Sequence, residues 1–132
     1  MGTDISHDIL KKASTGMYSQ FEVQRGMPIQ LLLKYFDKKD ETWEIKPDIK
    51  NMVQYKYWNL LDGLKQLGGF DIVFCRNVLI YFDAETKGKV LENISQLMPK
   101  DGMLFLGGAE TVLGVTDKFK PVQGQRGVYA LS

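Results

Sequence analysis

The sequence is poor in cysteine and histidine and has no long apolar run. Cys75 is the only cysteine, so no internal disulfide can form, and its apolar neighbours favour a small buried side chain in a reducing setting. His7 is the only histidine, and we expect it at the surface. No apolar run approaches the about 20 residues of a membrane span. The sequence shows no histidine or cysteine constellation for catalysis, and we expect no metal site.

Neither sign of charge is in excess. The 132 residues include 17 Lys and Arg against 16 Asp and Glu. Lys11-Lys12 and Lys38-Lys39 are short clusters typical of solvated faces, whereas a nucleic-acid footprint needs a basic stripe. Met1 leads directly into Gly2-Thr3-Asp4, without the basic and apolar leader of a secretory signal. We therefore expect a soluble cytoplasmic protein that binds no nucleic acid.

The order of the expected elements indicates an α/β fold in a single domain. The elements are a helix that begins near Asp4 or Ser6 and stops near Gly16, a helix over 28–36, a short helix over 61–67, a strand over 70–75, a helix capped by Asp83, a strand over 103–106 and a terminal hairpin of 119–122 and 127–131. This order predicts a sheet that is parallel in the middle and antiparallel at its end.

Residues 42–57 are expected to form a small β-hairpin insertion. Residues 42–46 alternate between apolar and polar, Pro47-Asp48 turns the chain, and 49–58 is rich in tyrosine and other strand formers. Residues 37–41 before it are expected to be a polar loop.

The stretch 70–82 carries the chemical signal. Its first half is an apolar run after Gly68-Gly69, typical of a strand buried on both faces in a parallel sheet. Arg76-Asn77 follows at the carboxyl end of that strand, the edge where open α/β sheets bind ligands. The alternative is a buried strand followed by an ordinary solvated turn.

Residues 70–82, FDIVFCRNVLIYF, resemble the signature of the CheR-type chemotaxis receptor methyltransferases. The similarity extends along nearly the whole chain. It includes Thr3–Ser6, Gly16-Met17-Tyr18, Tyr35-Phe36, Asn59-Leu60-Leu61, residues 99–105, Gly108-Ala109-Glu110 and Val128–Leu131. Several motifs in the family's order are more specific than a single glycine pattern.

The resemblance implies a partial Rossmann-like class I methyltransferase sheet, mostly parallel with a C-terminal antiparallel hairpin. The family's enzymes also have an N-terminal helical domain, a first strand and a Gly-rich loop, and nothing in residues 1–132 corresponds to them. The chain is thus similar to the C-terminal part of the family's methyltransferase domain, truncated at its N-terminus. In the family's sheet, the missing first strand lies between the second strand and the fourth. Because this leaves backbone donors and acceptors open, we expect a homodimer, strand exchange or pairing with a separate N-terminal half.

The activity that the resemblance implies is methyl transfer from S-adenosylmethionine to glutamate side chains of chemoreceptors, which leaves S-adenosylhomocysteine. A glutamate carboxylate is ionised at neutral pH, so it needs no strong general base. It needs a methyl group in line with its oxygen and a site shielded from water. Since about half of the family's cofactor site has no counterpart here, we expect the 132 residues alone to bind the cofactor weakly or not at all and to be inactive.

The resemblance also implies roles for six residues. Asp4 would accept hydrogen bonds from the ribose hydroxyls, or act as a helix N-cap. Asn59 and Leu60 would hold the adenine, although Asn59 is equally typical of a turn.

Arg76 and Asn77 would line the cofactor crevice. Tyr81 would lie near the reacting methyl group, where a ring can face a sulfonium cation or a phenol can orient the substrate carboxylate. Its alternative role is packing beneath the helix that follows.

A non-enzymatic role is the alternative function. Some family members use a comparable β-subdomain to bind a receptor tail by strand addition. The hairpin expected at 42–57 would then dimerise or dock a receptor, although the loop at 37–41 is short for this purpose.

Overall fold

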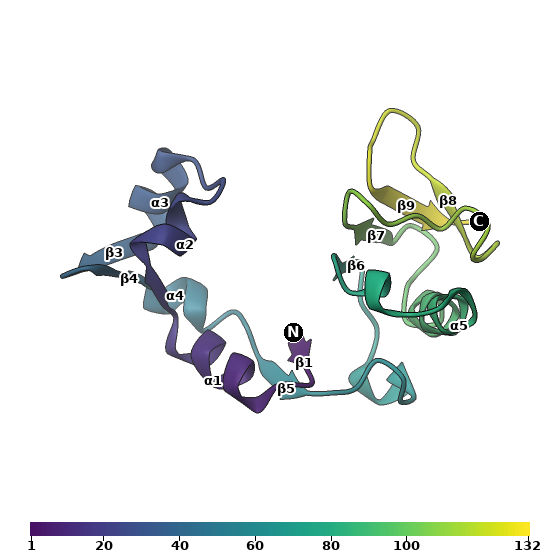
Figure 1. Cartoon of the computed structure of the whole chain (residues 1–132), viewed down its shortest axis with the longest axis horizontal. Helices are drawn as coiled ribbons and strands as arrows, with labels where there is room; N and C mark the ends of the chain where they lie inside the picture. Colours follow the sequence, from purple (N-terminus) through teal and green to yellow (C-terminus); the bar gives the residue numbers. More distant parts are fainter. The chain divides into compact units, whose positions relative to one another are not determined.

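The computed structural model describes all of residues 1–132, and contacts divide the chain into two compact units. Unit 1 is Met1–Asn59 and unit 2 is Leu60–Ser132. Both units combine helices with strands (Figure 1), so the predicted α/β class is confirmed. No helix of the chain has the length and the apolarity that crossing a membrane requires.

Unit 1 contains two small sheets. Its elements are β1 (Gly2–Asp4), α1 (His7–Thr15), β2 (Met17–Ser19), α2 (Gln20–Gln24), α3 (Ile29–Tyr35), β3 (Phe36–Lys39), β4 (Thr42–Ile45), α4 (Pro47–Lys50) and β5 (Tyr55–Tyr57). Strands β1 and β5 pair in parallel, and β2, β4 and β3 form an antiparallel sheet in that order.

Helix α1 begins and ends at residues suited to those positions, as the sequence predicts. The Ser6 hydroxyl accepts a hydrogen bond from the backbone N–H of Ile9 at 3.3 Å and caps the helix. Gly16 ends the helix with φ +68°, and a Cβ atom there would meet Cγ2 of Ile45 at 2.7 Å. Glycine is therefore required for both the backbone angle and the space.

The hairpin of unit 1 is formed by residues 36–45, so the prediction of a hairpin over 42–57 is wrong. Strand β4 pairs with β3, and β5 pairs with β1 instead. The tight turn uses Asp40 at φ +54°, a conformation that aspartate tolerates better than most residues. Pro47 occupies the first turn of α4, which separates β4 from β5. Most of β3 is charged and exposed, which is why its sequence is typical of a loop.

The core of unit 1 lies against the three-stranded sheet. Its buried residues are Val23, Leu32, Phe36 and Trp43, with Tyr18, Tyr35 and Ile45 packed against them. The indole N–H of Trp43 donates to Oε1 of Gln20 at 2.7 Å, which ties α2 to β4. Leu32 and Tyr35 of α3 thus pack in this core, whereas Leu31, which its helical spacing also places there, is 44% exposed.

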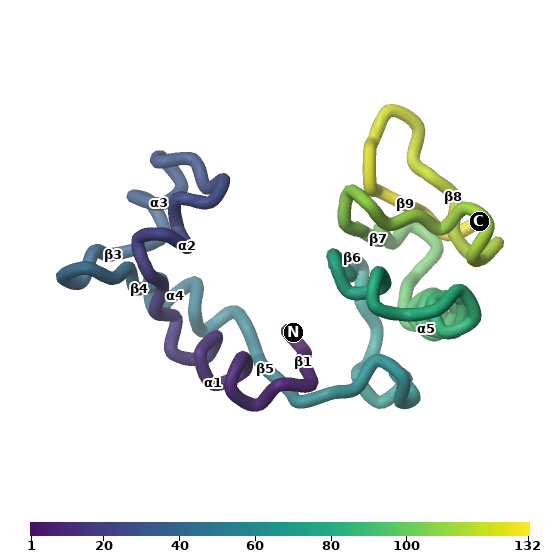
Figure 2. Tube along the Cα trace, viewed as in Figure 1, coloured from purple at the N-terminus to yellow at the C-terminus, as the bar shows by residue number.

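Unit 2 is built on one four-stranded sheet. Its elements are the 3₁₀ turn η1 (Leu64–Leu67), β6 (Ile72–Cys75), the 3₁₀ turn η2 (Leu79–Tyr81), α5 (Ala84–Ser95), β7 (Met103–Leu106), β8 (Phe119–Pro121) and β9 (Val128–Leu131). The strand order is β6-β7-β9-β8, with β6 and β7 parallel and the other pairs antiparallel. Figure 2 shows the β8–β9 hairpin at the end of the trace, as predicted.

Helix α5 covers one side of this sheet (Figure 1). Asp83 is its N-cap, because its carboxylate accepts the N–H of Thr86 at 2.8 Å. The inner face of the helix is buried, as are alternate residues of β7. The buried side chains are Val90, Leu91 and Ile94 on the helix and Leu104 and Leu106 on the strand. The predicted helix and its buried face are therefore confirmed.

Strand β6 is not buried on both faces, contrary to the prediction. Ile72 is 56% exposed and Phe74 is 70% exposed, whereas Cys75 is buried. The reason is the position of the strand, since β6 pairs only with β7 and lies at the end of its sheet. In unit 1, β1 likewise pairs only with β5. One backbone edge of β1 and one of β6 are thus without a strand partner in the chain.

Candidate functional site

The carboxyl ends of β1 and β5 bring Asp4 and Asn59 to the same edge of the parallel sheet of unit 1. Asp4 pairs with Tyr57 in the register, and its carbonyl oxygen accepts the N–H of Trp58 at 3.0 Å. Oδ1 of Asp4 accepts the N–H of Ser6 at 2.8 Å. Because Ser6 is the N-cap of α1, Asp4 does not have the alternative role expected for it. Asp4 is only partly buried, so its carboxylate is accessible at this edge.

The loop after β5 contains two more of the predicted site residues, at the boundary between the units. Asn59 and Leu60 are half-buried, and Leu60 begins a turn at the start of unit 2. In unit 1, the exposed His7 ring stacks on Tyr57, with ring centroids 4.4 Å apart and planes at 9°. His7 is therefore the surface histidine that the sequence predicts.

The polar end of β6 is exposed, as an edge that binds a ligand should be. β6 ends at Cys75, and Arg76 and Asn77 follow at once with exposed side chains. Asn77 adopts φ +60°, the left-handed conformation that few residues other than glycine and asparagine adopt readily. Tyr81 is 81% exposed at the end of η2. Tyr81 is thus not packed beneath the helix that follows it, which was its alternative role.

Glu110 joins the carboxyl ends of the two parallel strands of unit 2. Its side chain lies in the turn after β7, is only 9% exposed, and accepts four backbone hydrogen bonds. Oε2 accepts from Asn77 at 2.8 Å and Gly107 at 2.7 Å, and Oε1 accepts from Val78 at 3.0 Å and Leu79 at 2.8 Å. The carboxylate therefore fixes the loop that begins with Arg76-Asn77.

Electrostatics and space both fit an ionised Glu110. Burial by itself raises the pKa of this carboxyl, but the four N–H donors outweigh burial, and the pKa lies below its ordinary value of 4.5. A Cβ atom at Gly107 would collide with Oδ1 of Asn77 and would meet Oε2 of Glu110 at 2.7 Å. Burial, followed by the charge of Glu110, raises the pKa of the Cys75 thiol to about 11.

Glu110 is a residue of this site that sequence reasoning misses. It occurs in the Gly108-Ala109-Glu110 motif, which supports only the family resemblance. A carboxylate that follows two glycines at the end of a buried strand is a local signal for such a role. Three of its partners, however, lie 31 to 33 residues away in sequence, and spacing does not show that pairing.

The predicted site residues thus form two groups. Asp4 and Asn59 share one sheet edge in unit 1, and Arg76, Asn77 and Tyr81 lie beyond one strand in unit 2. A partly exposed carboxylate suits a ribose diol, and exposed amide and guanidinium groups suit the polar parts of a nucleotide-like ligand. Each group by itself therefore has the chemistry to contact polar parts of such a ligand.

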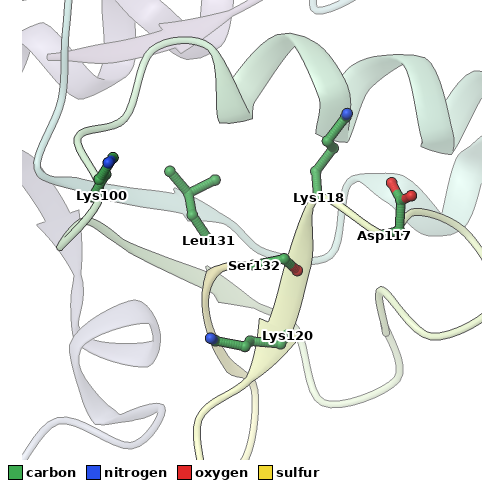
Figure 3. Close-up of a pocket in the computed structure, with 6 residues that line it drawn as sticks. All are labelled: Lys100, Asp117, Lys118, Lys120, Leu131 and Ser132. Atoms are coloured by element: carbon green, nitrogen blue, oxygen red, sulfur yellow. The ribbon is translucent and has the colours of Figure 1, made fainter.

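A separate hollow of about 560 Å³ lies at the C-terminal end of unit 2. It is lined by Lys100, Asp117, Lys118, Lys120, Leu131 and Ser132, none of which is a predicted site residue (Figure 3). Figure 3 shows the ammonium groups of Lys118 and Lys120 pointing apart. These lysines do not converge on one ligand position.

No cluster of three or more histidine, cysteine, aspartate or glutamate side chains suits a metal ion.

Parallel strands with polar side chains beyond their carboxyl ends are typical of α/β domains that bind nucleotides. Residues 1–128 match the family model described as CheR methyltransferase, SAM binding domain. The chain belongs to the CheR methyltransferase family.

Curated relatives agree with the family model. The chain is 41% identical over 129 residues to the chemotaxis protein methyltransferase Cher2 of Pseudomonas putida, covering 97% of the chain and 47% of the relative. It is 40% identical to chemotaxis protein methyltransferase 1 of Pseudomonas aeruginosa, with the same coverage of 97% and 47%. It is 36% identical to the chemotaxis protein methyltransferase of Salmonella typhimurium, covering 98% of the chain and 46% of the relative. The chain spans about half the length of the curated relatives it matches.

Proposed function

We propose that the protein is an S-adenosylmethionine-dependent methyltransferase that esterifies glutamate side chains of chemoreceptors in the cytoplasm. The observation that carries this proposal is the polar carboxyl end of β6, where Arg76 and Asn77 are exposed beside a loop fixed by Glu110. The family description supports the cofactor, and the names of the relatives support the chemotaxis context.

The proposed roles of the residues follow from their chemistry. The carboxylate of Asp4 accepts hydrogen bonds from the ribose hydroxyls. Asn59 forms a hydrogen bond with the adenine, and Leu60 makes an apolar contact with it. Arg76 and Asn77 orient the polar parts of the cofactor at the end of β6. The exposed Tyr81 orients the substrate carboxylate or faces the sulfonium group.

The reaction requires positioning more than proton transfer. Bound S-adenosylmethionine supplies a methyl group whose carbon–sulfur bond breaks as the glutamate oxygen forms the new bond, leaving the electron pair on sulfur. The attacking carboxylate is already ionised at neutral pH, so no proton has to be removed. The residues of the chain therefore need to align the two reactants and exclude water.

The experiment is methyl transfer from labelled S-adenosylmethionine to a chemoreceptor cytoplasmic fragment by the product of the complete gene. We expect base-labile label on the receptor, since glutamate methyl esters hydrolyse in alkali. Arg76→Ala and Tyr81→Phe should lower the rate at least about tenfold, the typical effect of losing one charged or orienting contact. Tyr55→Phe makes the same chemical change as Tyr81→Phe at the amino end of β5 and should leave the rate unchanged. No base-labile label would overturn the proposal.

For the 132-residue chain alone, we propose weak or no cofactor binding together with self-association or strand exchange. The unpaired edges of β1 and β6 support this, because open strand edges template pairing with another chain.

The second candidate function is a docking module without catalysis. The open outer edge of β3, next to the exposed Lys38 and Lys39, favours strand addition of a receptor segment. Binding of a receptor peptide that is lost when Lys38 is replaced by proline, without any methyl transfer, would favour this function.

A further inference from the structure

We propose that Glu110 is a positioning residue that holds Asn77 and the start of its loop in the conformation that the cofactor site needs. This inference rests on the proposed methyltransferase function. Glu110, which is not among the predicted site residues, thereby positions Asn77, which is one of them.

The geometry of the carboxylate supports this role. Both oxygens accept two backbone N–H groups each, and three of the four donors are the consecutive residues Asn77, Val78 and Leu79. Consecutive N–H groups that point to one place form a concave anion-binding nest. In this protein the anion is the carboxylate of Glu110, so a group of the same chain occupies the nest.

The backbone conformation of Asn77 also requires such support. Asn77 has φ +60°, which costs free energy for any residue with a Cβ atom and persists where the surroundings enforce it. The hydrogen bond from its N–H to Glu110 provides that enforcement. Asn77 is exposed, and its Oδ1 lies against Gly107 at the strand end where ligands bind.

The turn after β7 approaches the same carboxylate closely. Gly107 donates to the same oxygen as Asn77, and any Cβ atom at Gly107 would collide with the Asn77 side-chain oxygen. Glu110 thus couples two adjacent strand ends through one carboxylate. Its burial, at 9% exposure, keeps water from replacing these bonds.

The test uses Glu110→Gln in the product of the complete gene. Glutamine has the same shape, but its amide group turns N–H donors toward two of the four backbone donors. Amide hydrogen exchange should rise at least about tenfold at the pair that faces the new NH2 group, either Asn77 and Gly107 or Val78 and Leu79, because the lost bonds had protected these N–H groups from exchange. Unchanged exchange at these four amides would overturn the proposal.

Cofactor binding provides the second readout. Glu110→Gln should weaken S-adenosylhomocysteine binding at least about tenfold, while Glu110→Asp, which keeps the charge, should recover part of the loss. Asn77→Gly accepts positive φ freely but lacks the amide side chain. If Glu110 acts through Asn77, adding Glu110→Gln to Asn77→Gly should weaken binding by much less than about tenfold, a non-additive result. Fully additive losses would indicate general destabilisation and overturn the proposal.

The control is Asp83→Asn, which changes another carboxylate that accepts a backbone N–H, at the cap of α5. It should speed exchange at Thr86 and leave cofactor affinity unchanged. If the parent protein binds no S-adenosylhomocysteine, the proposed function fails, and with it the role of Glu110 in the cofactor site. If the parent binds and Glu110→Gln binds equally well, this inference alone fails.

Discussion

Glu110, in the turn after β7, and Cys75, the last residue of β6, have pKa values that shift in opposite directions. Glu110 is buried but receives four N–H donors, so it stays ionised with a lowered pKa. Burial together with the charge of Glu110 raises the pKa of the buried Cys75 to about 11. At neutral pH the neutral thiol of Cys75 thus ends β6, and the negative charge of Glu110 lies against the loop that follows.

The lowered pKa of Glu110 predicts a loss of stability in acid. Because the folded pKa lies below the ordinary value of 4.5, its stabilising effect is fully present above that pH and is lost as the pH falls through the folded value. Urea unfolding of the parent should show a free energy that falls below pH 4.5, and Glu110→Gln should show a smaller fall. Glu22 and Asp83 also have lowered pKa values, and they titrate equally in both proteins. Equal pH dependence in the parent and the variant would contradict this prediction.

The raised pKa of Cys75 predicts an unreactive thiol. With a pKa of about 11, the folded protein has very little thiolate near neutral pH. Modification by a thiol reagent should be at least about a hundredfold slower in the folded protein than in urea, since an unfolded cysteine has a pKa of about 8.5. Equal rates in buffer and urea would show that Cys75 is not buried.

At the scale of elements, α5 is the main apolar support of the sheet in unit 2. Leu91 is 0% exposed at the centre of its buried face. Leu91→Ala should lower the free energy of unfolding by about 2–5 kcal/mol, because it removes buried methyl groups and leaves a cavity. Urea unfolding measures the loss, and Glu92→Ala, the next residue and exposed, is the control that should change little. Equal effects of the two changes would contradict the packing described for α5.

The elements that the sequence predicts correctly are those with local signals. Ser6 and Gly16 mark the ends of α1, and Asp83 with the 3.6-residue apolar spacing behind it defines α5. The partners of strands are set by contacts between distant residues. For this reason the predicted hairpin at 42–57 is wrong, since β5 pairs with β1, which lies far earlier in the chain.

The candidate site is predictable only in part, for the same physical reason. Arg76 and Asn77 are visible as candidates because a polar pair at the end of an apolar strand occurs in one short stretch of sequence. The role of Glu110 depends on a contact across two strands, and the exposure of Phe74 depends on what pairs with β6. Neither follows from residue spacing.

At the scale of the whole molecule, the unpaired edges of β1 and β6 predict association of the 132-residue chain. Open strand edges carry unsatisfied N–H and C=O groups, and pairing with a second chain satisfies them. Size-exclusion chromatography with light scattering should give a mass of at least twice the 15.0 kDa of one chain. A monomer at all concentrations would contradict the expectation.

A proline in β6 provides a variant for this association test. The carbonyl oxygen of Asp71 accepts the N–H of Met103 in β7, so in a parallel ladder the N–H of the next residue, Ile72, points to the open edge. Ile72→Pro removes that edge donor and should shift the mass toward the monomer. Ile72→Thr, which keeps the N–H and the branched side chain, is the matched control and should associate like the parent. Equal masses for the proline and threonine variants would show that this edge does not mediate the association.

Isothermal titration with S-adenosylhomocysteine tests most directly whether these residues form part of an S-adenosylmethionine site. The product of the complete gene and the 132-residue chain are titrated side by side. We predict micromolar binding by the gene product, lost on Asp4→Ala, and binding by the chain alone that is much weaker or absent. Tight binding by a monomeric 132-residue chain would contradict the incomplete site, and no binding by the gene product would contradict the function itself.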